Sequence, residues 1–147
     1  MTQDGVVTKY TYDAMGNITQ ISENNEVERS YTYDALNQLT SETRDGIAET
    51  YTYDNGGNIL SRTRSGVTDT WSYESTLWKD LLTSYNGQAI TYDEIGNPLT
   101  YRDGMTMTWK HGRQLSTLTK DGGSISYTYN ADGVRTSKTV NGQTTEY

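Results

Sequence analysis

The chain has 147 residues, of which 32% are hydrophobic, and it carries a formal net charge of −7 at neutral pH. The absence of Cys excludes disulfides and thiolate metal sites, and the acidic balance, with no cluster of Lys or Arg, disfavours nucleic acid as a partner. No apolar run approaches the roughly 18–20 residues of a membrane span, so membrane insertion is not expected, and no signal-peptide pattern opens the chain.

Composition places the chain between disordered and all-β proteins. The mean hydropathy is −0.84 and Phe is absent, which is close to the composition of disordered chains. However, the 13 Tyr, the 3 Trp and the single Pro favour β-strands, because aromatic side chains fit a pleated, half-buried surface. We therefore expect an ordered, all-β chain.

A recurring string, Tyr-Thr-Tyr-Asp, organises the sequence. Full copies end at Asp13, Asp34 and Asp54, and four degenerate copies follow. A period near 20 residues is typical of a repeat array, in which each unit buries its apolar side chains against its neighbours. The sequence thus predicts a single array over residues 1–147, with about seven hairpin units. The second aromatic residues of the seven copies lie 17 to 21 residues apart, at Tyr12, Tyr33, Tyr53, Tyr73, Tyr92, Trp109 and Tyr129.

Residues 27–43 represent the repeat unit. In an extended strand over 27–33, Val27, Arg29, Tyr31 and Tyr33 would lie on one face, and Glu28, Ser30 and Thr32 on the other. A turn follows at 34–37, and a second strand at 38–43. The next unit begins after another turn, so each unit is expected to form one antiparallel hairpin.

Two kinds of turn alternate along the chain. The first has the pattern Asp-x-x-Gly-Asn, at residues 13–17, 54–58 and 93–97. In this turn the Asp is expected to accept backbone N–H bonds and the Gly to adopt a positive φ. The second is a short x-Gly turn that suits two-residue type I′ hairpins. Its copies are Asp45-Gly46, Ser65-Gly66, Asn86-Gly87, Asp103-Gly104 and Asn141-Gly142.

Alternation of these turns predicts a continuous antiparallel meander of roughly 12–14 strands, two per repeat. A meander of that length should twist or wind as a spiral rather than stay flat. One irregular insertion, near residues 75–85, interrupts it. There the spacing of Leu77, Trp78, Leu81 and Leu82 fits one or two helical turns, either as a plug against the sheet or as a docking patch for a partner. Pro98 predicts either an edge position or a lost ladder bond.

The repeated side chains have two interpretations each. The Tyr-x-Tyr pairs are expected to pack between strands, although a sugar-stacking platform is the alternative. The repeated Asp is expected to cap its turn, because a calcium loop needs several carboxylates close together. His111 is the only His, so it has no partner for a catalytic or metal set. We therefore expect no catalytic, cofactor-binding or metal-binding residue.

The residues expected to define the repeat structurally are aromatic, Asp and Gly side chains at fixed positions of each unit. They are Tyr10, Tyr12, Asp13, Gly16, Tyr31, Tyr33, Asp34, Tyr51, Tyr53, Asp54, Gly57, Trp71, Tyr73, Tyr92, Asp93, Gly96, Trp109, Gly112, Tyr127, Tyr129 and Gly133.

From about Val6 to Tyr147 these units resemble the YD repeats of the RHS family, whose unit reads Tyr-x-Tyr-Asp-x-x-Gly-Arg/Asn-Leu-Thr. The irregular stretches 78–87 and 90–99 are similar to RHS proteins of Gram-positive bacteria. The family's Arg after the turn Gly stands only at Arg113 and, more loosely, at Arg135. Nothing in the chain resembles the core domain that follows the repeats in full-length members, so no self-cleavage residue is carried over.

The resemblance implies a non-enzymatic role. Family members are large bacterial secreted or cell-surface proteins, related to tripartite toxin C components and to animal teneurins, and their repeats wind into a hollow β-shell that encloses a toxin. The expected partners are the rest of the parent shell and its enclosed C-terminal domain. Self-association through uncapped sheet edges is a further expectation. The alternative is an adhesion module that binds a glycan or a protein through exposed Tyr and Trp.

Overall fold

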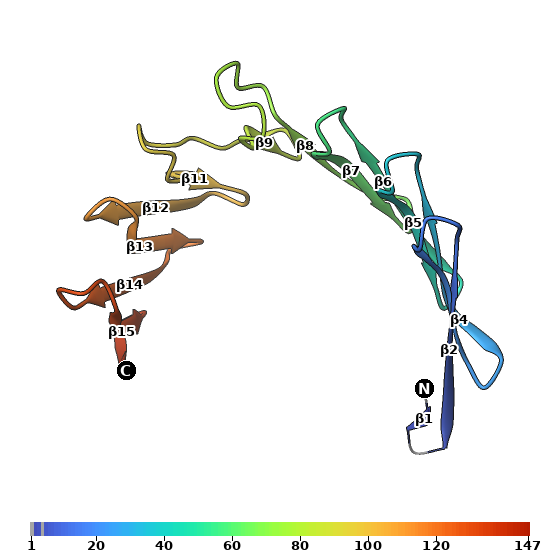
Figure 1. The fold of residues 1–147 in the computed structure, drawn as a ribbon. Coiled ribbons are helices and arrows are strands. Elements are labelled where there is room, and N and C mark those ends of the chain that lie inside the picture. Colours follow the sequence, from blue (N-terminus) through green and yellow to red (C-terminus); the bar gives the residue numbers. More distant parts are fainter. Residues whose placement is uncertain (1, 4) are drawn as a thin grey trace. The chain divides into compact units, whose positions relative to one another are not determined.

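A computed structural model of the protein describes residues 2–3 and 5–147. The chain divides into two compact units, Met1–Trp71 and Ser72–Tyr147, and each consists of strands joined by turns (Figure 1). Every regular element among the described residues is a β-strand, which confirms the all-β antiparallel prediction. Within the same residues, no helix is long and apolar enough to cross a membrane.

The N-terminal unit is an antiparallel meander in which each strand pairs with the next one along the chain. Its strands are β1 (Thr2–Gln3), β2 (Val6–Tyr12), β3 (Ile18–Glu23), β4 (Glu26–Tyr33), β5 (Leu39–Arg44), β6 (Ile47–Tyr53), β7 (Ile59–Arg64) and β8 (Val67–Ser72), the last of which ends at the first residue of the second unit.

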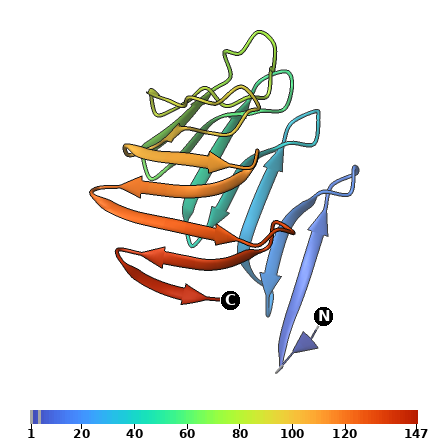
Figure 2. The same cartoon turned by 90° about the vertical axis from the view of Figure 1, so that its left-hand side faces the viewer.

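The C-terminal unit begins with a small hairpin and continues as a six-stranded sheet. Strands β11 to β16 pair in chain order, and the arrows of β12 to β15 run in alternating directions in Figure 2. The strands are β9 (Ser84–Tyr85), β10 (Gln88–Ala89), β11 (Thr100–Tyr101), β12 (Met105–Lys110), β13 (Gln114–Lys120), β14 (Gly123–Tyr129), β15 (Arg135–Val140) and β16 (Gln143–Glu146).

The described residues hold 16 strands, more than the 12–14 that the sequence predicts. The difference comes from β1, β9, β10 and β11, each only two residues long. Around Pro98 pairing is reduced to an isolated bridge between Pro98 and Tyr92. This agrees with the expected loss of a ladder bond, because Pro has no N–H to donate.

The turn chemistry holds throughout. All five predicted x-Gly turns have positive φ at both residues, for example 51° at Asp45 and 73° at Gly46, so the type I′ prediction is confirmed. Asn24-Asn25 and Asp121-Gly122 adopt the same conformation. Asn and Asp tolerate positive φ better than other non-Gly residues.

The helical prediction for the insertion is wrong. Residues 75–83 form an irregular loop whose only local backbone bond runs from the Leu81 N–H to the Trp78 carbonyl, at 3.0 Å. The Ser75 hydroxyl accepts the Trp78 N–H at 3.0 Å. A single turn bond does not propagate into a helix, because helix nucleation is costly.

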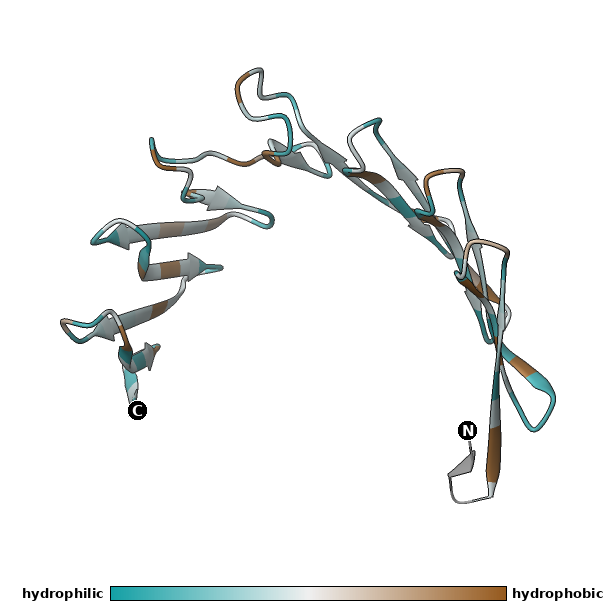
Figure 3. Cartoon of the chain, in the orientation of Figure 1, coloured by the Kyte–Doolittle hydropathy of each residue, from teal (hydrophilic) through white to brown (hydrophobic). Residues whose placement is uncertain are grey.

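Neither unit has a thick core. Ile90 is the one hydrophobic residue of the described chain that is buried, with 6% of its surface exposed. Apolar residues are scattered among the strands of both units (Figure 3). Single-layer sheets of this kind depend on contacts between neighbouring hairpins, and those contacts form the candidate site.

Candidate functional site

Each Asp of the first turn type organises a whole turn. In the 54–58 turn, one Asp54 carboxylate oxygen accepts the N–H of Gly56 at 2.8 Å and that of Asn58 at 2.9 Å. The other oxygen accepts the Asn58 side-chain amide at 2.9 Å. That amide and the backbone N–H groups hold the pKa of Asp54 below its ordinary value. Asp13 and Asp93 make the same three contacts.

Two other turns keep part of this pattern. Asp34 accepts the N–H groups of Leu36 and Gln38. At the last copy, Asn130 replaces Asp and its side-chain oxygen accepts two backbone N–H groups, from Asp132 and Val134. A side-chain oxygen at this position is therefore what the turn requires, because it satisfies two backbone donors that no ladder reaches.

Neighbouring turns of the first type touch one another. The Asn17 amide donates to the Asn37 side-chain oxygen at 2.8 Å, and the Asn97 amide donates to the Gly112 carbonyl at 2.7 Å. The Gln38 amide nitrogen lies 3.0 Å from the place where a Cβ on Gly57 would stand. The residue after the turn Gly thus links one repeat to the next.

The second aromatic residue of a copy clamps its repeat to the preceding one. The hydroxyl of Tyr33 donates to the Ile18 carbonyl at 2.8 Å, and that of Tyr53 donates to the Leu39 carbonyl at 2.8 Å. The contacts have the same form in the C-terminal unit: Tyr92 to the Leu82 carbonyl, Trp109 to the Pro98 carbonyl and Tyr129 to the Leu115 carbonyl.

These clamps act where the ladder is irregular. In five hairpins the strand register shifts immediately before the second aromatic residue, as between Thr52 and Tyr53. A bulge removes one residue from the ladder pairing. Ile18, Leu39 and Leu115 pair with the second aromatic residue at such a shift, and the next repeat's Tyr bonds to their carbonyls.

Hydroxyl groups line the opposite face of the strands. Pairs of Thr or Ser bond across neighbouring strands, as between Thr52 and Ser61 at 2.6 Å and between Thr108 and Thr117 at 2.6 Å. Cross-strand Thr and Ser pairs stabilise a sheet modestly. This face therefore offers a polar surface.

Burial changes the acidity of the clamping tyrosines. Burial raises the pKa of Tyr33, Tyr53 and Tyr92. It also raises the pKa of Tyr51 to about 12, and the Glu49 carboxylate that accepts the Tyr51 hydroxyl at 2.9 Å adds to that shift. The folded protein therefore favours neutral phenols at these positions.

We expect the protein to lose stability in alkali. Phenols of the unfolded chain ionise near pH 10, whereas those of the folded chain ionise later, so their contribution is complete below about pH 10 and falls as pH rises through the folded pKa values. The thermal midpoint should drop steeply between about pH 10 and 12, together with a rise in tyrosinate absorbance. A midpoint that stays constant over this range would contradict the expectation.

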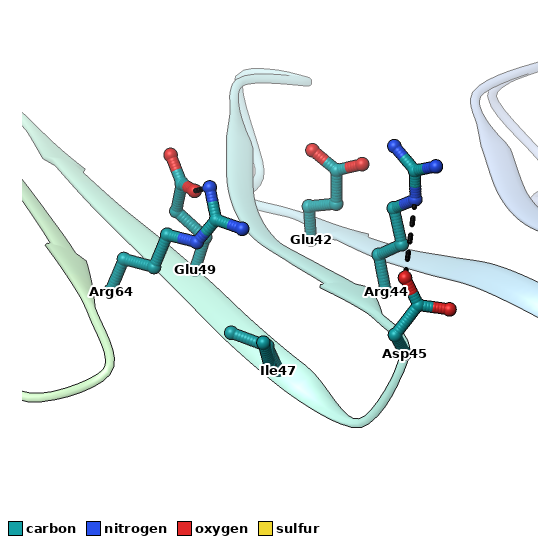
Figure 4. A pocket seen from close by; sticks show the side chains of 6 residues that line it. All are labelled: Glu42, Arg44, Asp45, Ile47, Glu49 and Arg64. Carbon is teal, nitrogen blue, oxygen red and sulfur yellow. Dashed lines mark ion pairs between the residues drawn. The ribbon is translucent and has the colours of Figure 1, made fainter.

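The N-terminal unit also has a hollow of about 220 Å³ that is lined by five charged residues and by Ile47. Figure 4 shows Arg64 beside Glu49 and Arg44 beside Asp45, with N···O distances of 3.7 and 3.5 Å. These charges neutralise one another on a partly exposed surface, where ion pairs contribute little stability. The described residues include no group of three His, Cys, Asp or Glu that could hold a metal ion.

The remaining predicted positions vary in their surroundings. Tyr10 and Tyr12 are 40% and 57% exposed, whereas Tyr31, Trp71 and Tyr73 are half-buried. The Tyr127 ring lies beneath the Arg135 guanidinium, 4.7 Å from it. The turn glycines Gly16, Gly96 and Gly133 have φ of 91°, 84° and 78°. His111 lies exposed in a turn, at φ 46°.

Sequence reasoning missed two contacts between turns. The Trp78 ring lies over Gly96, so that a Cβ there would stand 2.8 Å from it. Arg113 donates to the Ile95 carbonyl at 2.8 Å. Arg113 stands at the position of the family's Arg after the turn Gly, which was the available signal. Nothing in the local sequence of the insertion indicates that Trp78 reaches Gly96.

Comparison with known proteins identifies the repeat. Residues 3–147 match the family model described as Teneurin YD-shell. No curated protein matches the chain. Among solved structures, a Tc holotoxin pore of Photorhabdus luminescens with mutated TccC3 aligns at a TM-score of 0.65 and 22% identity, over 90% of this chain. A TcdB2-TccC3 crystal structure aligns at a TM-score of 0.62 and 23% identity, over 92%. In both cases this chain spans only 9% of the other.

Proposed function

Because the chain belongs to the Teneurin YD-shell family, we propose that it is a non-enzymatic wall segment of a β-shell, and that the shell encloses a polypeptide of the parent protein. The observation that carries this proposal is the recurring Tyr-to-carbonyl clamp, which joins successive hairpins without a core. Such a sheet can extend by adding repeats.

The likeness in fold to Tc toxin chains supports the same role. This chain spans 9% of those chains, so a closed shell would need many more repeats than the segment supplies. We infer that the partners are the adjoining parts of the parent shell and the polypeptide inside it. We also infer that the parent is secreted or displayed at the cell surface.

The proposal is tested by protease protection in the parent protein. If this segment is part of a closed wall, the enclosed polypeptide should resist protease in the intact protein. Deletion of residues 27–67, two repeat periods, should expose it. Equal cleavage rates before and after the deletion would rule out enclosure by this segment. A catalytic turnover lost on the same deletion would contradict the non-enzymatic role.

An adhesion module that binds glycans is the second candidate. It is favoured by the exposure of Tyr12 and Trp78, at 57% and 49%. Quenching of Trp fluorescence by one member of a glycan panel would support it, and no response would count against it. Self-association through unpaired sheet edges stays a prediction, which light scattering of the isolated segment would test.

A further inference from the structure

Two adjacent hollows of the C-terminal unit form one groove, here called the Tyr129 groove. The first measures about 200 Å³ and is lined by Lys110, Ser116 and Tyr127. The second measures about 340 Å³ and extends to Asn130. The hollows share His111, Gln114 and Tyr129, so they are continuous. The groove follows the turn between β12 and β13 and reaches the end of β14.

Several polar side chains face this groove without a partner. Ser116 is only 7% exposed, and its hydroxyl makes no hydrogen bond within the described residues. No fully buried side-chain polar atom of the described chain lacks a partner, so this hydroxyl keeps some contact with solvent, and Ser116 lines the first hollow. A hydroxyl that makes no hydrogen bond within the protein is available to donate to, or accept from, a group that enters the groove.

The one formally charged side chain that lines the groove, Lys110, also lacks an ion-pair partner among the described residues. Neither Lys110 nor His111 forms an ion pair in the part of the chain that the structure describes. By contrast, Arg62 and Lys120 lie 2.9 and 3.1 Å from carboxylates. The Gln114 amide likewise makes no side-chain hydrogen bond. Donors to a carboxylate therefore stand at one end of the groove, and amides stand along it.

The geometry points to an extended acidic polypeptide segment as the occupant. A carboxylate would accept from Lys110 and from the Ser116 hydroxyl, in charge-assisted hydrogen bonds. The Gln114 amide can both donate to and accept from a peptide group, and the Tyr127 and Tyr129 rings offer apolar walls. A continuous double hollow suits a linear chain better than a compact molecule.

The net charge of −7 means that any binding of an acidic segment must be local. The chain as a whole repels acidic partners, so an acidic peptide binds here only through the local groups of the groove. The inference concerns one groove in one unit and does not depend on the proposed shell role.

The test is an NMR titration of the 147-residue chain labelled with ¹⁵N. The probe is the blocked peptide acetyl-Ala-Glu-Ala-Glu-Ala-amide, and its neutral counterpart carries Gln in place of Glu. The acidic peptide should shift amide signals of residues 110–116 and 127–131, with a Kd on the order of 1 mM or below. The neutral peptide should leave them unchanged.

Matched variants show whether the named groups do the binding. Lys110→Gln should weaken the acidic peptide about tenfold, by removal of the charged donor, and Ser116→Ala should weaken it severalfold. Lys9→Gln removes the same charge from β2 in the other unit and should have no effect. Thermal midpoints of the three variants should match the parent, which separates lost binding from lost fold.

Three results would overturn the assignment. The first is equal shifts with the Gln peptide, and the second is the absence of shifts at millimolar peptide. The third is a shift of the same residues by glucuronic acid at lower concentration than the peptide needs, which would make the groove a sugar-acid site. Normal binding of the acidic peptide by Lys110→Gln would show that Lys110 is not part of the site.

Discussion

Replacing Gly57 by Val is expected to lower the free energy of unfolding of the N-terminal unit by about 1–3 kcal/mol. Gly57 has φ of 87°, a conformation that a β-branched residue strongly resists. The added side chain also meets the Gln38 amide nitrogen, 3.0 Å from the position of the new Cβ. The substitution therefore strains one turn and disturbs its contact with the preceding turn.

The measurement is native-state hydrogen exchange of amides in β5, β6 and β7, which reports local opening free energies. Two Ala variants separate strain from contact. Gly66 has φ of 78° with nothing within 4 Å of a new Cβ, so Gly66→Ala reports backbone strain alone. Gly57→Ala should lower the opening free energy more than Gly66→Ala does, and the difference measures the effect of the contact with Gln38. Equal costs would show that the contact between turns contributes nothing.

Much of this architecture can be predicted from the sequence because its determinants are local. Type I′ turns need residues that accept positive φ, and the x-Gly pairs identify these turns in the sequence. Strand alternation is equally local, since side chains of successive residues point to opposite faces. The positions of Asp45-Gly46 and Ser65-Gly66 therefore predict where the hairpins of the N-terminal unit reverse.

The structure of the insertion could not be predicted from local sequence patterns. The spacing of Leu77, Trp78, Leu81 and Leu82 imitates a helical face, but the segment is too short to form a helix without tertiary support. Trp78 instead lies over Gly96, 18 residues further along the chain. A contact of this kind depends on how the loop closes, and neither periodicity nor turn chemistry contains that information.

The contacts of the candidate site can be predicted from the sequence only in part. The repeat predicts that Tyr33, Tyr53 and Tyr129 are equivalent, but it does not predict their hydrogen-bond acceptors. Those acceptors are carbonyls beside bulges, and a bulge depends on the register of two strands rather than on one residue. The Tyr129 groove is less predictable still, because its lining comes from strands β12, β13 and β14 and from the turns that follow β12 and β14.

Replacing Tyr53 by Phe should lower the unfolding free energy of the N-terminal unit by about 1–2 kcal/mol, because the Leu39 carbonyl would lose its donor in a half-buried setting. The hydroxyl donates to that carbonyl at 2.8 Å. The Phe ring keeps the packing of the Tyr ring, so the change isolates the hydrogen bond. Hydrogen exchange should increase most around Leu39 in β5, at the far end of the clamp.

The chain offers its own control for this substitution. Tyr12 occupies the same place in the first repeat, but it is 57% exposed and its hydroxyl has no partner within the described residues. Tyr12→Phe should therefore change the opening free energy by less than about 0.5 kcal/mol, as expected of a surface substitution. The same substitution at equivalent repeat positions then removes a hydroxyl that bonds to a carbonyl in one case and an exposed hydroxyl without a partner in the other. Equal effects at Tyr12 and Tyr53 would mean that the rings, and not the hydroxyl clamps, hold the hairpins together.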